Sequence, residues 1–122
     1  MTRTMENTLV VDDWRTMKFE ATTVRTVERG IQFLYSQPWD EVWLDFDLGG
    51  HEDMRPLIFK VEEDAINGII LPVKMFVLHT GMGGMKEWMA RRLLPWYTVG
   101  VAKAHEWADY PVGYVDWDDE GW

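Results

Sequence analysis

Four apolar runs recur along the chain and predict β-strands. The runs are continuous rather than alternating and are rich in β-branched and aromatic residues, as expected for strands that are covered on both faces. They span residues 9–11, 42–46, 73–78 and 97–101, and a weaker candidate spans residues 20–25. These segments predict a mostly parallel sheet.

Three amphipathic patterns lie between these runs and predict helices. The first follows the N-cap candidate Thr26, the second begins near Asp53 with Gly68 just beyond its end, and the third ends at Pro95. Their apolar positions are Val27, Ile31 and Leu34, then Leu57, Ile58, Val61 and Ala65, then Met85, Trp88, Met89 and Leu93. This alternation of strands and helices predicts an α/β domain.

The link between the first two predicted strands is unusually short. Only a handful of residues separate Asp13 from the segment 20–25, whereas a parallel pair usually has a crossover helix. Either that helix is reduced or missing, or the second strand is misplaced.

Composition indicates one globular domain. The chain has 122 residues, of which 47% are hydrophobic and 27% are charged, and it has no cysteine for a disulfide or a thiolate metal site. No apolar run approaches the roughly 18 residues of a membrane span, and the first residues lack the apolar segment of a signal peptide. We therefore expect a cytoplasmic protein that does not enter a membrane.

Charge is distributed unevenly. The net charge is -9, and residues 106–122 hold six acids and no Lys or Arg, so that this segment carries -6 and the rest carries -3. The chain has no basic stripe, which argues against binding to duplex DNA. We expect a domain over residues 1–105 and an acidic, aromatic extension over residues 106–122.

Polar side chains follow each of the four strong strand candidates. Ligands of open α/β sheets bind outside the carboxyl ends of the strands, so these side chains are expected to converge on one edge. They are Asp12, Asp13 and Arg15 after the first strand, Asp45 and Asp47 in and after the second, His79 and Thr80 after the third, and Lys103 after the last.

The four aspartates at this edge predict a metal site. Carboxylate oxygens are the ligands that Mg²⁺ (or Mn²⁺) prefers, and the ion would offset the cost of holding acids out of water. Asp45 and Asp47 are two residues apart, and the alternation of side chains along a strand predicts that they face the same side. Gly81, Gly83 and Gly84 lead into the third helix, where free N–H groups would suit a phosphate.

Three short motifs follow one another along the chain. They are Asp12-Asp13-Trp14-Arg15, Leu44-Asp45-Phe46-Asp47-Leu48-Gly49 and His79-Thr80. In this order they resemble the motifs of the cyclic-phosphate processing receiver domains, a divergent branch of the response-regulator receiver superfamily. The resemblance covers about residues 8–103 and includes the shortened first link. It implies a receiver-like (flavodoxin-like) five-stranded sheet flanked by helices, with the first crossover helix reduced or missing.

The same resemblance implies a function. It predicts a Mg²⁺-dependent site that binds, and hydrolyses, a cyclic phosphate or other phosphate ester of a nucleotide or RNA end. Under this hypothesis Asp45, His79 and Thr80 are catalytic, and Arg15 and Lys103 contact phosphate together with the glycines. Phe46 stands where this branch usually has His, and the Asn usual shortly after the His-Thr pair is absent.

A second hypothesis is a catalytically inactive interaction protein on the same scaffold, of the kind a phage would encode. The chain has eight tryptophans, and aromatic residues are enriched at protein interfaces. The residues expected to bind a protein partner are Trp107, Tyr110, Tyr114 and Trp117. Alternatively, residues 110–115 form an edge strand or cover a helix. An ordinary phospho-accepting receiver, with Asp45 as the acceptor, is a third reading that the extra Asp47 disfavours.

Overall fold

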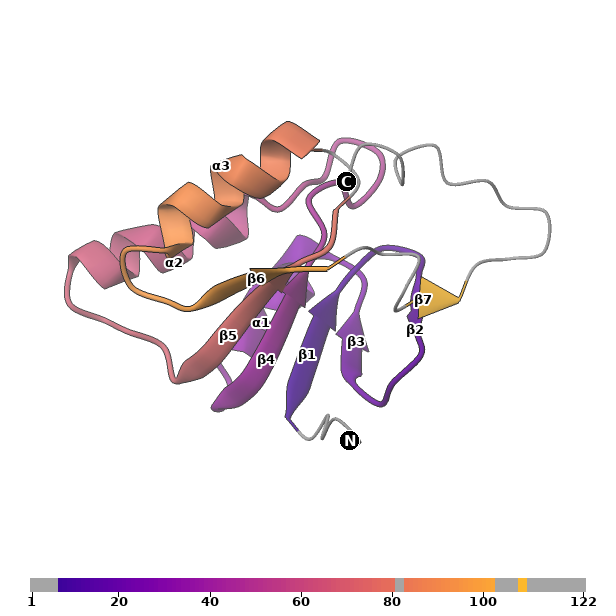
Figure 1. The fold of residues 1–122 in the computed structure, drawn as a ribbon, viewed down its shortest axis with the longest axis horizontal. Helices are drawn as coiled ribbons and strands as arrows, with labels where there is room; N and C mark the ends of the chain where they lie inside the picture. Colours follow the sequence, from indigo (N-terminus) through magenta and orange to yellow (C-terminus); the bar gives the residue numbers. More distant parts are fainter. Residues whose placement is uncertain (1–6, 81–82, 103–107, 110–122) are drawn as a thin grey trace.

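Five parallel strands form the central sheet of the computed structural model, which describes residues 7–80, 83–102 and 108–109 (Figure 1). In spatial order the strands are β3 (Thr22–Val24), β1 (Thr8–Val11), β4 (Trp39–Leu44), β5 (Val73–Leu78) and β6 (Val99–Val101). Every neighbouring pair in this sheet is parallel. Of these five strands β3 is the second in the sequence, and it lies at the edge of the sheet with β1 between it and β4, which is the flavodoxin-like order. The predicted α/β fold and the weak strand at residues 20–25 are confirmed.

The three predicted helices are also present. They are α1 (Val27–Leu34), α2 (Arg55–Ile66) and α3 (Gly83–Leu93). Thr26 caps α1, because its Oγ1 accepts a hydrogen bond from the Arg29 N–H at 3.2 Å. Gly68, with φ +88°, lies just beyond the C-cap of α2 in the left-handed region that glycine tolerates best. No helix in the described ranges is long and apolar enough to span a membrane.

The strands bury both of their faces, but by different means. One face packs against all three helices, and its strand residues include Leu9, Val42 and Phe76. The opposite face presents Val10, Trp43 and Val77, which are covered by Met17, Phe19 and Ala21 of the segment that follows β1. Cover on both faces explains why the apolar runs are continuous, although the second cover is not helical.

The segment between β1 and β3 contains no helix, which is one of the two alternatives that the short link left open and the one that the family resemblance implied. It contains β2 (Thr16–Met17), which pairs antiparallel with β7 (Ala108–Asp109) (Figure 1). Two-residue strands are too short to produce a periodic sequence signal, so this pair was not predicted. Since β7 falls within residues 106–122, the predicted extension contributes a strand that lies beside the segment carrying Arg15.

Candidate metal and phosphate site

Three side chains lie side by side at the carboxyl edge of the sheet. Asp12, Asp45 and His79 each stand one residue beyond a strand, namely β1, β4 and β5, whose last residues are paired in register. The backbone N–H groups of Asp45 and His79 continue the ladder, each with a 3.1 Å bond to the preceding strand. Alternation along the strands places all three on the same face as Trp43, and the His79 ring lies 5.8 Å from the Trp43 ring.

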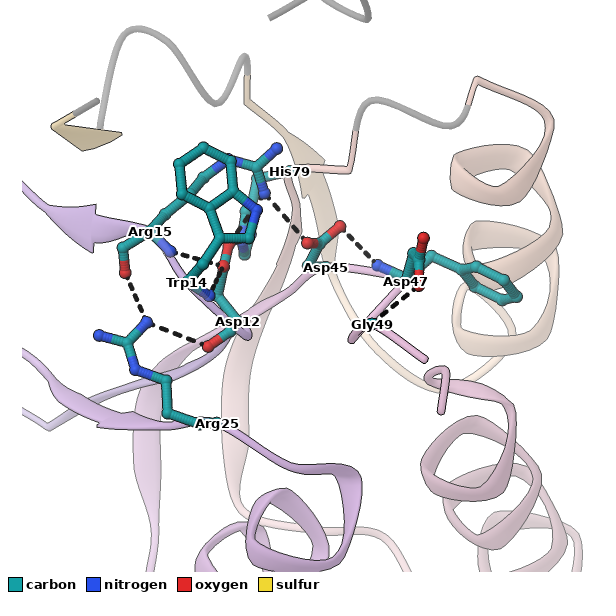
Figure 2. A network of polar contacts seen from close by, with 9 residues as sticks. Asp12, Trp14, Arg15, Arg25, Asp45, Asp47, Gly49 and His79 are labelled. Atoms are coloured by element: carbon teal, nitrogen blue, oxygen red, sulfur yellow. Dashed lines mark hydrogen bonds and ion pairs between the residues drawn. The ribbon is translucent and has the colours of Figure 1, made fainter. Parts of the chain in front are cut away.

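The carboxylate of Asp12 is fully buried and accepts four hydrogen bonds (Figure 2). Its Oδ1 accepts the backbone N–H groups of Trp14 and Arg15 at 3.1 and 3.0 Å. Its Oδ2 accepts Nη1 of Arg15 at 3.1 Å and Nε2 of His79 at 2.9 Å. A carboxylate has about four lone-pair sites, so the hydrogen-bonding capacity of Asp12 is filled.

Arg15 joins the two buried aspartates. The same Nη1 that contacts Asp12 lies 3.0 Å from Oδ2 of Asp45, and Arg15 is only 5% exposed. Arg25, directly after β3, donates to the backbone carbonyls of Asp12 and Arg15 at 3.1 and 2.7 Å and so holds this segment in place. Sequence reasoning missed Arg25, although a basic residue after a strand lies at this same edge.

Asp12, Asp13 and Asp45 form the acidic cluster of the site. Each offers an oxygen within 4.8 Å of the others. Oδ1 of Asp13 is buried and has no hydrogen-bond partner in the part of the chain that the structure describes. Gly49, with φ +87°, passes so close that a Cβ there would lie 3.1 Å from Oδ2 of Asp13. An oxygen-only donor set with one unsatisfied buried oxygen fits Mg²⁺, which Asp12, Asp13 and Asp45 would hold.

The pKa values of the cluster reflect its burial. Burial raises the pKa of Asp45 to about 6, and the neighbouring Asp12 charge adds to this rise, while His79 and Arg15 oppose it. Burial and the Asp12 charge also raise the pKa of Asp13. Burial alone would raise the pKa of Asp12, but the hydrogen bond and charge interaction with His79, followed by Arg15, lower it to about 2. The positively charged groups of the site therefore stabilise the ionised form of Asp12 most. Asp13 and Asp45 remain costly to ionise, and a divalent cation would lower that cost.

Asp47 lies outside this cluster. The strand β4 ends at Leu44, so the alternation that predicted a shared face for Asp45 and Asp47 stops before either residue. Asp47 is exposed, and its Oδ1 accepts the Gly49 N–H at 2.9 Å. Phe46 is buried between them and packs edge-on against Trp88 on the helical face, with ring centroids 6.1 Å apart.

The structure describes only some of the remaining predicted site residues. Thr80 is buried and its side chain is hydrogen-bonded to Asp45. Gly83 and Gly84 are the first residues of α3 rather than part of a loop before it. Six further predicted residues, from the phosphate-binding and partner-binding sets, lie outside the described residues: Gly81, Lys103, Trp107, Tyr110, Tyr114 and Trp117.

A groove of about 1150 Å³ opens beside the acidic cluster, between the start of α1 and the loop that leads into α2. Gly49, whose backbone passes beside Asp13, also lines this groove and so joins the two. Its apolar wall includes the half-exposed ring of Phe59, and its polar wall includes Glu52, which accepts the Val27 N–H. Sequence reasoning did not identify this groove, because it depends on how two loops approach each other.

A parallel sheet in flavodoxin-like order, with acids at the ends of its first and central strands, defines a receiver-like domain. The chain belongs to the family of cyclic-phosphate processing receiver domains, whose sequence model matches residues 7–94. Neither the curated proteins nor the solved structures contain a significant match.

Proposed function

We propose that this protein is a Mg²⁺-dependent domain that binds a phosphate ester of a nucleotide or RNA end and hydrolyses its 2′,3′-cyclic phosphate. The observation that supports this most is the convergence of Asp12, Asp13 and Asp45 within 4.8 Å at the carboxyl edge of a cyclic-phosphate processing receiver domain. This edge is where open α/β sheets bind their ligands.

Each group at the edge has a task in this proposal. The bound ion would neutralise charge on the phosphoryl group. Asp12, Asp13 and Asp45 hold the ion, while Arg15, Lys103 and the N–H groups at the start of α3 bind non-bridging oxygens. His79 is completely buried and bonded to Asp12, so we assign it to positioning that carboxylate. In the reaction a water oxygen bonds to phosphorus, one ribose oxygen–phosphorus bond breaks, and the proton of the water passes to the released ribose oxygen.

The neighbouring groove supports a nucleoside as the rest of the substrate. Its lining holds three acids, Glu28, Glu52 and Asp53, against the single arginine Arg55, which is ion-paired with Asp53 at 2.8 Å. Such a surface disfavours further phosphates but offers acceptors to the amino and hydroxyl groups of a nucleoside. The exposed ring of Phe59 is suited to stacking on a base.

The test is hydrolysis of 2′,3′-cyclic mononucleotides with and without Mg²⁺. We expect Mg²⁺-dependent turnover in the wild type and a loss of at least tenfold in Asp45→Asn and Asp13→Asn. Asp47→Asn is the matched control, because it removes the same charge outside the cluster, and it should retain most of the activity. An Asp45→Asn protein as active as the wild type would exclude this site.

A second candidate, a domain that binds metal and phosphate without turnover, is favoured by one observation. Phe46 is 6% exposed and packs on Trp88, so it offers no proton donor or acceptor where this branch usually has His. Such a protein would act as an interaction module. Wild-type protein that binds Mg²⁺ and cyclic nucleotide without hydrolysing it, together with a Phe46→His variant that gains turnover, would support this candidate over the first.

A further inference from the structure

We infer that Arg15 is a tethered cation that competes with the metal ion for Asp12 and Asp45, so that metal binding releases its guanidinium to the phosphate of the ligand. This inference rests on the proposed metal site and adds a coupling between the two ligands of that site.

The first argument is the hydrogen-bonding capacity of Asp12. Two backbone N–H groups fill its Oδ1, and His79 and Arg15 fill its Oδ2. A metal ion that takes an oxygen of Asp12 must therefore displace one of these four donors. The two backbone bonds belong to the turn itself, and His79 is completely buried. The Arg15 side chain is the donor that can leave at the smallest structural cost.

The second argument is the charge of Arg15. One nitrogen, Nη1, lies 3.1 Å from Asp12 and 3.0 Å from Asp45, between two of the three carboxylates that would hold the ion. A divalent ion bound there would lie close to a guanidinium that is 5% exposed, where water screens their repulsion poorly. Metal and guanidinium therefore exclude each other from these oxygens.

The third argument is a route for the side chain. The Cζ of Arg15 lies 4.7 Å from the ring of Trp14, and Trp14 is 37% exposed. The guanidinium thus already stacks on a ring that reaches the surface, and a rotation of the side chain along this ring leads it out of the carboxylate pair. The stacking contact lowers the cost of such a move, because arginine keeps its cation–π partner.

The consequence is positive coupling between metal and phosphate. Metal binding frees a guanidinium whose planar fork matches a phosphate, and phosphate binding holds that guanidinium away from the metal ligands. By linkage, each ligand must raise the affinity for the other by the same factor. A site in which Arg15 simply stayed on the aspartates would show no such contribution from this residue.

The experiment is a calorimetric Mg²⁺ titration of the full chain, with and without inorganic phosphate, in the wild type and Arg15→Gln. We expect Arg15→Gln to bind Mg²⁺ alone at least tenfold more tightly than the wild type. We also expect phosphate to strengthen Mg²⁺ binding several-fold in the wild type and to have a much smaller effect in Arg15→Gln. Arg25→Gln is the matched control, because Arg25 contacts carbonyls of the same segment and no carboxylate of the described residues, and its Mg²⁺ affinity should stay within about threefold of the wild type.

A charge-preserving variant keeps the test decisive if Arg15→Gln does not fold, which circular dichroism would reveal. Arg15→Lys keeps the competing charge, so its Mg²⁺ affinity should also stay within about threefold of the wild type, and a tenfold gain would overturn the inference. Equal Mg²⁺ affinity in folded Arg15→Gln and wild type would overturn it as well, while leaving the proposed function intact. Absence of Mg²⁺ binding in every variant would overturn both.

Discussion

At the scale of single residues, the site depends on how its positively charged partners are divided between the buried carboxylates. Asp12 accepts four hydrogen bonds and has a pKa lowered to about 2, whereas Asp45 shares Arg15 with it and has a pKa raised to about 6. Two carboxylates at equivalent strand ends therefore differ in how easily they ionise. The unequal division follows from His79, which bonds to Asp12 and not to Asp45 in the hydrogen bonds that the structure describes.

Asp45→Asn is expected to stabilise the metal-free protein in a pH-dependent way. The folded-state pKa of Asp45, about 6, lies above the ordinary value of 3.8, so this residue favours folding below pH 3.8, and that contribution is lost as the pH rises through 6. The stability of Asp45→Asn relative to the wild type should therefore increase between pH 4 and pH 7.5, by an amount on the order of 2–3 kcal/mol. Urea unfolding in the presence of EDTA at several pH values measures this difference.

The exposed Asp47 provides the control for that experiment. Asp47→Asn removes the same charge two residues away, outside the buried network. A stability difference for Asp45→Asn that stays constant with pH, or that changes equally in Asp47→Asn, would contradict the role given to burial at Asp45.

At the scale of elements, the strands position the acids and the loops decide what lies beside them. The turn after β4 brings Gly49 against Asp13, and the same loop meets the start of α1 to form the groove. Sequence reasoning predicted the ends of β1, β5 and β6, because the apolar runs stop there. It placed Asp47 in the site because it extended the strand to Phe46, whereas β4 ends at Leu44. Phe46 lies beyond the end of the strand, and its apolar side chain packs on Trp88.

Phe59→Ala is expected to weaken binding of a 2′,3′-cyclic nucleotide by about fivefold or more, because stacking of a base on an aromatic ring contributes roughly 1–3 kcal/mol. Affinity for Mg²⁺ and for inorganic phosphate should not change, since Phe59 lines only the groove in the described site. Calorimetry with each ligand separates these effects.

Ile66→Ala is the control on the same helix, because Ile66 is 67% exposed and does not line the groove. The Phe59 ring also packs edge-on against Trp88, with ring centroids 5.5 Å apart. Phe59→Leu, which preserves more of this packing than Phe59→Ala, should also weaken nucleotide binding, and unchanged affinity in both variants would contradict a stacking role.

At the scale of the whole molecule, the arrangement is a sheet with helices on one face and a short strand pair beside the other. At the carboxyl edge, the side chains of Asp12, Asp45 and His79 lie on the non-helical face, and the side chain of Phe46 lies on the helical face. Trp14 and Arg15, which donate hydrogen bonds to these acids, belong to the segment between β1 and β3, which replaces the missing crossover helix and pairs with β7.

Mg²⁺ is expected to raise the melting temperature of the whole domain, because a ligand that binds only the folded state stabilises it. At a concentration of 100 times Kd the gain is about 2.7 kcal/mol, or roughly 10 °C for a domain of this size. The increase should be largest near pH 8 and should shrink at pH 5, where Asp45, with a pKa of about 6, is mostly protonated. Scanning calorimetry at constant ionic strength measures it. Asp13→Asn should abolish most of the increase, and an equal increase in that variant would place the ion elsewhere.

The sequence by itself determined the order of strands and helices, the missing crossover and the alignment of Asp12, Asp45 and His79 at one edge. These follow from local periodicity and from the rule that parallel strands end together, so they need no knowledge of the loops. Only the tertiary structure decided that Arg15 lies between Asp12 and Asp45, that Asp47 points outward and that a groove adjoins Asp13. These depend on the path of loops and two-residue strands, which have no periodicity, and on contacts between residues far apart in the sequence, such as Arg15 and Asp45, which are 30 positions apart.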